Sequence, residues 1–191
     1  MIPESIKIVI AGGFGSGKTT FVGAVSEIEP MRTEELLTQA SIGVDDLDGI
    51  ESKRHTTVAL DFGRITISPT HVLYLFGTPG QDRFWFMWDE LARGALGAVV
   101  LVDTRRLDKS FAAIDYFERR GLPFIVAINM FDGLCEYTDE EVTAALRLKE
   151  SVPIVRCDVR HTDQAKLALI RVVRHVMSRV KAEQPAAQAS H

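Results

Sequence analysis

A glycine-rich turn at residues 12–19 constrains the fold of this chain more than any other feature. Its sequence, GGFGSGKT, matches the pattern GxxxxGK[ST], in which x is any residue. A β-branched run at residues 6–11 precedes the turn, and a helical pattern at residues 18–27 follows it. Because the pattern needs a strand before it and a helix after it, the motif predicts an α/β domain with a phosphate-binding loop.

Each residue type in this loop has a physical role. Glycines let the backbone approach a phosphate with its N–H groups pointing inward, and the N-terminus of the next helix adds a favourable dipole. Lys18 can span the outer phosphates, which makes it a candidate catalytic residue, and the Thr19 hydroxyl can ligate Mg²⁺. We therefore predict that a nucleotide contacts Gly15, Ser16, Gly17, Lys18, Thr19 and Thr20.

Strand and helix patterns continue after the loop. Strand-like runs at residues 57–67 and 71–76 are so close in the sequence that they must form an antiparallel hairpin. Strand and helix patterns then alternate at residues 98–102, 109–120, 124–129, 139–149, 154–156 and 164–181. This alternation predicts a mostly parallel, six-stranded sheet in the order 2-3-1-4-5-6, with about five helices on its two faces.

Two segments lack a clear period. Residues 29–56 are polar and acidic, and we expect a long connection there with at most a short helix at residues 33–39. Residues 182–191 also lack a pattern, so we expect a disordered tail after a single domain at residues 1–181.

Composition excludes several classes of function. The 191 residues are 46% hydrophobic and carry a net charge of −4, which argues for a globular domain and against nucleic acid as a partner. The apolar runs are shorter than the roughly 18 residues of a membrane span, and neither end carries a lipidation signal. Two cysteines without CxxC spacing, and no secretory leader, predict a cytoplasmic protein that would reach a membrane only through partners.

The pair Asn129 and Asp132 suggests which base is bound. Both residues follow an apolar strand, at the end where open α/β sheets bind ligands. A carboxylate at this place can accept hydrogen bonds from N1–H and the 2-amino group of guanine, whereas adenine presents an acceptor at N1 and lacks the amino group. The spacing NxxD alone is a weak signal because Asn and Asp are common in turns, but its position one strand before residues 157–160 strengthens it.

In this order the motifs resemble those of the Ras-like small GTPases over residues 6–180. The resemblance implies a GTP-binding switch that hydrolyses GTP with Mg²⁺. It implies that Gly80 faces the γ-phosphate, that Gln81 orients the attacking water, and that Thr57 closes on the metal, with Thr56 as the alternative. The backbone of the last loop would contact the guanine oxygen through Cys157, Asp158 and Val159.

One departure from the pattern concerns the metal. Gly77 stands where these GTPases have an aspartate that holds Mg²⁺ through water, and Asp61 can replace it from the same strand face as Thr57. The implied metal-binding residues are therefore Thr19, Thr57 and Asp61. This combination resembles the bacterial polarity GTPases of the MglA type and, more closely, the GTPases of actinobacterial conservon operons. The resemblance to these two groups implies that this protein has a roadblock-domain partner.

Further departures concern activity. Met130 replaces the lysine that lies over the base, which predicts a lower nucleotide affinity. Phe14 occupies the loop position beside the γ-phosphate, where a bulky group can obstruct Gln81 or an incoming arginine, so we expect slow intrinsic hydrolysis. Arg54 or Arg83 can act as an arginine finger worth ~10³ to 10⁵ in rate, although a solvated turn is the commoner role of such a residue.

Three alternatives remain open. The aromatic segment at residues 84–88 predicts an exposed partner surface at Trp85 and Trp88, or else a satellite of the core. The strand that ends at Asp103 is also typical of a P-loop ATPase or small-molecule kinase. That interpretation gives no role to Asn129 and Asp132. A nucleotide-bound scaffold with little hydrolysis is the third possibility.

Overall fold

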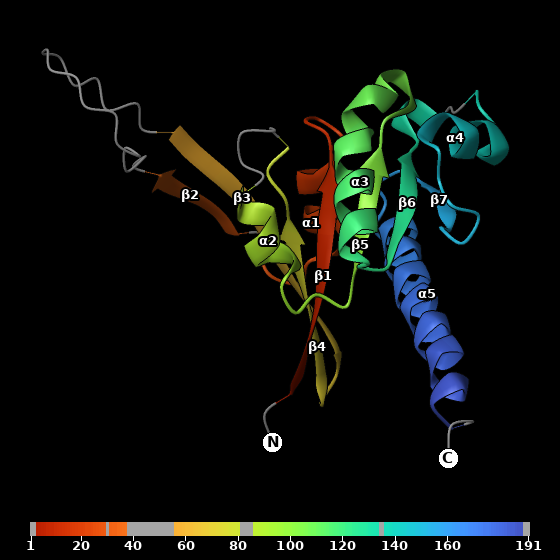
Figure 1. Ribbon diagram of the computed structural model, residues 1–191. Helices are drawn as coiled ribbons and strands as arrows, with labels where there is room; N and C mark the ends of the chain where they lie inside the picture. Colours follow the sequence, from red (N-terminus) through yellow and green to blue (C-terminus); the bar gives the residue numbers. More distant parts are fainter. Residues whose placement is uncertain (1–2, 30, 38–55, 81–85, 134–135, 189–191) are drawn as a thin grey trace, which may run out of the picture.

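A computed structural model describes residues 3–29, 31–37, 56–80, 86–133 and 136–188. In these segments one sheet lies between two layers of helices, as Figure 1 shows. The strands are β1 (Glu4–Gly12), β2 (Met31–Leu37), β3 (Thr56–Ser68), β4 (His71–Gly77), β5 (Gly97–Val102), β6 (Phe124–Asn129) and β7 (Ile154–Cys157). The helices are α1 (Lys18–Val25), α2 (Phe86–Ala92), α3 (Phe111–Arg120), α4 (Asp139–Leu146) and α5 (Thr162–Gln188), with short 3₁₀ helices η2 (Thr104–Ser110) and η3 (Phe131–Gly133).

The sheet has the strand order β2-β3-β4-β1-β5-β6-β7. Strand β1 pairs in parallel with β4 and β5, and the hairpin of β3 and β4 is antiparallel. The predicted α/β class and the order of the six predicted strands are thus confirmed. A seventh strand, β2, extends the sheet by pairing antiparallel with β3.

Strand β2 corrects the expectation for the connection. We expected at most a short helix at residues 33–39, and residues 33–37 are instead part of a strand. Their sequence, TEELL, has no alternation of apolar and polar residues. The main-chain pairing with β3 therefore determines the structure here, as is common for edge strands, where local propensity is weak.

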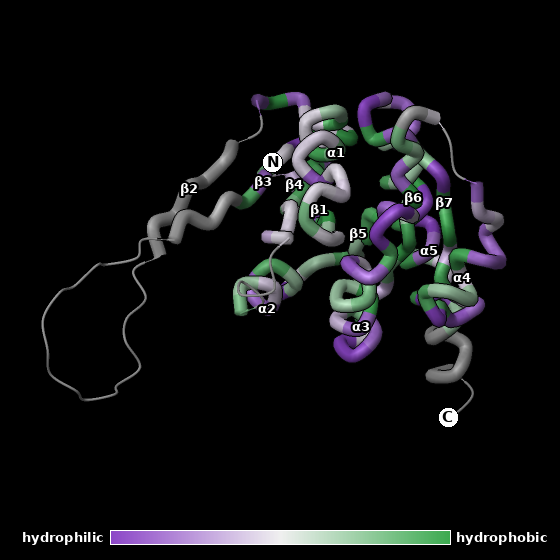
Figure 2. Tube along the Cα trace, turned by 90° about the horizontal axis from the view of Figure 1, so that it is seen from above, coloured by the Kyte–Doolittle hydropathy of each residue, from purple (hydrophilic) through white to green (hydrophobic). Residues whose placement is uncertain are grey.

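The core lies on both faces of the sheet, because successive residues of each strand point to opposite sides. In β1, Ile8 and Ile10 pack with α1 and α5, whereas Val9 and Ala11 pack with the cluster of α3 around Phe117. Strands β5 and β6 are buried along their whole length, which explains their unbroken apolar sequence. Figure 2 shows the hydrophobic residues gathered in these central strands.

Helix α5 is longer than its sequence pattern predicted. It continues to Gln188, so residues 182–188 are helical where we expected no regular structure. Alanines at positions 182, 186 and 187 favour a helix, whereas Pro185 opposes one, so local propensity alone does not explain this extension. Within the described segments, no helix combines the length and the apolar character needed to cross a bilayer.

Candidate nucleotide-binding site

The predicted site residues gather at one edge of the sheet. Strands β1, β4, β5, β6 and β7 run parallel, so the loops that follow them lie at the same edge. This is the edge at which open α/β sheets bind ligands. The loop after β1 carries the phosphate motif, and the loops after β6 and β7 carry the predicted base-reading residues.

The phosphate loop has a backbone that requires glycine. Gly12, Gly15 and Gly17 have φ angles of 141°, 76° and 102°, which side chains of L-residues rarely adopt. A Cβ at Gly12 would lie 2.4 Å from the carbonyl oxygen of Leu101, and one at Gly17 would lie 2.7 Å from Nδ2 of Asn129. The loop is therefore packed against its neighbours so closely that only glycine fits at these positions.

Lys18 lies at the start of α1 and is buried. Its ammonium group donates to the carbonyl oxygens of Gly12 and Gly13 at 2.9 and 2.7 Å. Burial lowers the pKa of Lys18 to about 8, although the nearby Asp61 opposes this shift. The charge is thus held inside its own loop by two carbonyl oxygens, within reach of a phosphate that binds there.

Gly80 lies against this loop, next to the lysine. A Cβ at Gly80 would come within 2.9 Å of Nζ of Lys18 and of the backbone of Phe14. The ring of Phe14 itself is 68% exposed. The structure therefore brings the second predicted switch to the phosphate loop at Gly80, while Gln81 lies outside the described residues.

Thr19 contacts the candidate metal-holding carboxylate. Its hydroxyl donates to Oδ2 of Asp61 at 2.7 Å, and Asp61 is buried. Asp61 lies opposite Gly77 in the register of β3 and β4. A Cβ at Gly77 would lie 3.0 Å from the same Oδ2. The carboxylate of β3 thus fills the space in which a side chain from position 77 would lie.

Thr57 is placed differently from the other predicted metal ligands. It lies in β3 and pairs with Leu36 of β2. Asp61 lies four positions after Thr57 in this extended strand, which puts their Cα atoms about 13 Å apart. The conformation described here therefore does not bring Thr57 to Thr19, and Thr57 would have to move to reach a metal there.

The residues at this end fit Mg²⁺ and a phosphate chain. A hydroxyl from Thr19 and a carboxylate from Asp61 are the oxygen ligands that Mg²⁺ prefers, directly or through water. In the described part of the chain, the buried hydroxyl oxygens of Ser16 and Thr78 have no hydrogen-bond partner. Buried polar groups are normally paired, so these two hydroxyls indicate a site built for a polar ligand.

Asn129 joins the phosphate loop to the loop after β7. Its Nδ2 donates to the carbonyl oxygen of Ser16 at 3.1 Å, and its Oδ1 accepts from the amide of Val159 at 3.3 Å. The amide of Met130 donates to the carbonyl oxygen of Cys157 at 2.9 Å. Asp132 lies in η3, directly after these contacts, although the orientation of its side chain is outside the described structure.

Asp158 stabilises the loop after β7. Its carboxylate accepts from the backbone amide of Arg160 at 3.0 Å and from Nη2 of the same residue at 2.6 Å. These bonds hold the pKa of Asp158 at about 2. Burial raises the pKa of the neighbouring Cys157 thiol to about 12. The carboxylate of Asp158 is therefore paired within its own loop.

Asp103 follows β5 and bonds to arginines. It is buried and accepts from Nε and Nη2 of Arg105 at 2.8 and 2.9 Å, and from Arg106 at 3.4 Å. The bonds from Arg105 hold the pKa of Asp103 below its usual range. The carboxylate that contacts Thr19 is therefore Asp61, whereas Asp103 is bonded to these two arginines. Arg105 and Arg106 carry no pattern of their own in the sequence, and the one signal that could have found them is their position directly after a buried strand and an aspartate.

The aromatic segment is divided between core and surface. Trp88 is 3% exposed, stacks near Phe117, and donates from Nε1 to the carbonyl oxygen of Pro79 at 3.3 Å. The prediction of Trp88 as an exposed partner surface is therefore wrong, because its indole belongs to the core. Phe86 is 61% exposed. Trp85, Arg83 and Arg54 lie outside the described residues.

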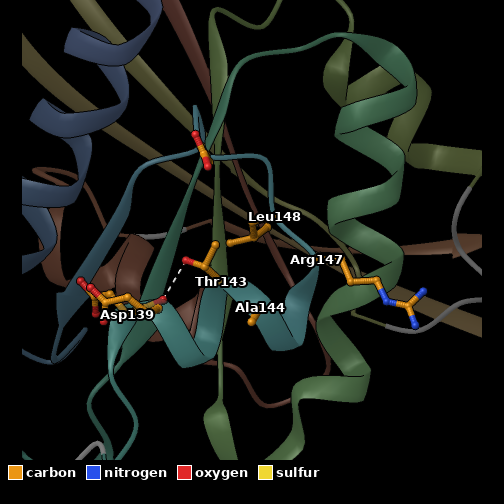
Figure 3. Close-up of a pocket in the computed structure, with 7 residues that line it drawn as sticks. Asp139, Thr143, Ala144, Arg147 and Leu148 are labelled. Carbon is orange, nitrogen blue, oxygen red and sulfur yellow. Dashed lines mark hydrogen bonds between the residues drawn. The ribbon is translucent and has the colours of Figure 1, made fainter.

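A surface hollow elsewhere contains none of the predicted site residues. Figure 3 shows Asp139 and Arg147 extending in opposite directions along α4, with a bond from the Thr143 hydroxyl to the carbonyl oxygen of Asp139. Its lining consists of Asp139, Glu140, Thr143, Ala144, Arg147, Leu148 and Glu150. Because these residues all come from one short stretch, the hollow is a feature of the α4 surface.

Comparisons with known proteins place the chain in a nucleotide-binding family. A family model described as "Conserved hypothetical ATP binding protein" matches residues 10–179. The uncharacterised protein MJ1339 of Methanocaldococcus jannaschii is 30% identical over 134 residues, which cover 69% of this chain and 74% of that protein.

Among solved structures, the chain is similar to the G domain of the FeoB iron transporter of T. maritima, with a TM-score of 0.61 and 15% identity over 90% of this chain and 99% of that chain. The cytosolic domain of the same transporter in apo form gives a TM-score of 0.62 and 16% identity over 91% of this chain and 64% of that one. At this level of identity the likeness establishes the G-domain fold.

Proposed function

The chain belongs to the family described as conserved hypothetical ATP-binding proteins and has the fold of a G domain, and we propose, from Asn129 and Asp132 and from the resemblance to Ras-like GTPases, that it is a guanine-nucleotide switch with slow GTP hydrolysis. The observation that carries this proposal is the convergence of two segments on the phosphate loop. Asp61 binds Thr19, and Gly80 packs against Lys18. Two segments that touch the phosphate site can respond to the number of phosphates bound there.

Different residues of the phosphate loop bind the phosphates and the metal in this proposal. Backbone N–H groups of Gly15, Ser16 and Gly17, with Lys18, hold the phosphate chain. Thr19 and Asp61 would hold Mg²⁺, which when bound neutralises charge on the β- and γ-phosphates. Thr20 lies one residue further into α1, at the positive end of the helix dipole.

The switch residues complete the proposed mechanism. Gln81 would orient the attacking water, and the amide of Gly80 would donate to the γ-phosphate. Thr57 would close on the metal, and this step requires it to leave its place opposite Leu36. Loss of the γ-phosphate would release both segments.

The base is held by the loops after β6 and β7. Asp132 would accept from N1–H and the 2-amino group of guanine, and Asn129 positions its loop by bonding to Ser16 and Val159. The backbone of Cys157, Asp158 and Val159 would contact the guanine oxygen. These roles rest on the resemblance to Ras-like GTPases together with the position of the residues at one edge of the sheet.

A competition experiment tests the base assignment. GDP and ADP compete against a fluorescent nucleotide for the wild type and for Asp132→Ala. We expect the wild type to prefer GDP by roughly a hundredfold or more, and the variant to lose this preference, because hydrogen-bonded sites reject ligands that leave their polar groups unpaired. A wild-type preference for ADP would overturn the guanine assignment in favour of an ATPase, which the description of the family supports.

Single-turnover hydrolysis tests the enzymatic role. The resemblance to MglA-type and conservon GTPases supports a roadblock-domain protein as partner, which would carry a cytoplasmic switch to a membrane without direct insertion. We expect slow GTP turnover by the domain at residues 1–181, acceleration by the roadblock partner, and loss of both in Gln81→Leu. If no GTP is hydrolysed with or without the partner, the proposed GTPase activity is rejected. The nucleotide-bound scaffold is then the remaining interpretation.

A further inference from the structure

The 3₁₀ helix η2 packs directly on the phosphate loop at two points. A Cβ at Gly13 would lie 2.5 Å from Cβ of Lys109, and a Cβ at Gly15 would lie 3.0 Å from Nη2 of Arg106. The first contact fixes the end of η2 against the loop. The second places a guanidinium group beside the backbone that cradles the phosphates.

The backbone of η2 and the pairing of its neighbour set the position of Arg106. The φ and ψ angles of Arg106, −145° and 56°, interrupt the helix. Arg105 donates two hydrogen bonds of 2.8 and 2.9 Å to the carboxylate of Asp103. Its guanidinium lies 4.0 Å from the ring centroid of Phe131. Arg106 therefore shares Asp103 only at 3.4 Å and extends to Gly15.

The charge of Arg106 is less committed than those of Lys18, Arg160 and Lys109, the last of which pairs with Asp108 at 3.0 Å. Lys18 is buried and donates to two carbonyl oxygens, and Arg160 is bound to Asp158 at 2.6 Å. The side chain of Arg106 is 49% exposed, and its distance to Asp103 is at the outer limit of a hydrogen bond. An arginine held in this way keeps donors available for an anion.

We propose that Arg106 is a second phosphate-binding cation, which contacts the α- and β-phosphates of the bound nucleotide beside Gly15. The backbone of a loop of this type cradles the α- and β-phosphates, so a cation at Gly15 meets both diphosphates and triphosphates. The planar guanidinium can donate two parallel hydrogen bonds to phosphate oxygens. The inference rests on the proposed function only in requiring a nucleotide in this loop, and it is independent of the base.

The test is an affinity series with an increasing number of phosphates. Dissociation constants for guanosine, GMP, GDP and GTP are measured by calorimetry at fixed salt for wild type, Arg106→Ala, Arg106→Lys and Arg119→Ala. Arg119 is an exposed arginine on α3 that donates to the carbonyl oxygen of Asp115, so it serves as a matched control. If Arg106→Ala fails to fold, Arg106→Gln takes its place in the series.

We expect Arg106→Ala to lower the affinity for GDP and the affinity for GTP by about tenfold each, which is the effect of losing one charge-assisted contact. Guanosine should bind unchanged, the lysine variant should recover part of the loss, and Arg119→Ala should bind like the wild type. Three results would overturn the proposal: GDP affinity within about twofold of the wild type, a loss confined to GTP, or an equal loss for guanosine.

The failure of this inference can be told apart from failure of the proposed function. If the wild type prefers ADP, the guanine assignment fails and the same series is measured with adenosine, AMP, ADP and ATP. If the preference for GDP holds while the Arg106 series is flat, only the role of Arg106 is rejected.

Discussion

The two ends of the candidate site differ in how their polar groups are paired. At the base end, Asn129 bonds to Ser16 and to Val159, and Asp158 bonds to Arg160. At the phosphate end, Lys18 bonds to carbonyl oxygens of its own loop, and Ser16 and Thr78 bury hydroxyls without a partner in the described chain.

This difference shows which end of the candidate site is already formed without a ligand. The base end has its hydrogen bonds in place, so binding a base there costs little reorganisation. The phosphate end holds a buried charge and two unpaired hydroxyls, which are costly until a ligand pairs with them. The comparison predicts that substitutions at the phosphate end change binding more than folding, whereas those at the base end change both.

Substitution of the buried lysine should show the largest effect. Lys18→Met removes the charge that faces the phosphates, and we expect GDP affinity to fall on the order of a hundredfold. The same change removes a buried charge whose pKa is lowered to about 8, so the protein without nucleotide should unfold at a temperature a few degrees higher. Calorimetry with and without GDP measures both quantities, and an unchanged affinity would contradict the division between the two ends.

The carboxylate of Asp61, which we propose as the metal-holding group, allows an exchange experiment. Asp61→Ala should raise the Mg²⁺ concentration needed for nucleotide binding by about thirtyfold, because outer ligands orient the metal and its waters. A Cβ at Gly77 would lie 3.0 Å from Oδ2 of Asp61, so a carboxylate from position 77 can enter the same space.

The double variant D61A/G77D should therefore bind nucleotide at nearly the Mg²⁺ concentration of the wild type. Gly77→Asp alone places two carboxylates together and serves as the control, with weaker folding as the expected result. Failure of the double variant to recover, while it still folds, would show that Asp61 does more than supply a carboxylate at this point.

Much of this arrangement could be predicted from the sequence. The phosphate motif, the apolar strands β5 and β6 and the hairpin of β3 and β4 gave the fold class and the order of six strands, because burial on both faces forces unbroken apolar runs. The sequence also singled out Asp61 and Gly77 as a related pair, and the structure places them opposite each other in β3 and β4, while the metal-holding role of Asp61 stays a prediction.

Other features depend on tertiary contacts that no local pattern records. Strand β2 has no alternation and exists through pairing with β3, and Trp88 is buried by the aromatic cluster of α3. The position of Arg106 beside Gly15 results from packing between η2 and the phosphate loop, which are far apart in the sequence.

Substitution of Asn129 tests how much the base end contributes to the stability of the fold. Asn129→Ala leaves the carbonyl oxygen of Ser16 and the amide of Val159 without partners in a buried place, and we expect the free energy of unfolding to fall by about 2 kcal/mol. Urea unfolding without nucleotide measures this loss. Thr143→Ala, which removes an exposed hydroxyl on α4, is the control and should change stability by less than about 1 kcal/mol. A stable Asn129 variant would show that the base end is not held together by this residue.

The smallest effect concerns the acid stability of the base end. Bonds from Arg160 lower the pKa of Asp158 from its ordinary value to about 2, so the folded state releases this proton more readily than the unfolded chain. The carboxylate therefore stabilises the fold above the pKa of the unfolded chain, and this contribution is lost as the pH falls toward 2. Asp158→Asn should be less stable than the wild type at pH 7 by about 1 kcal/mol, and the difference should shrink between pH 4 and pH 2. Unfolding measured across that range decides the point, because a constant difference would mean that shape rather than charge holds this loop.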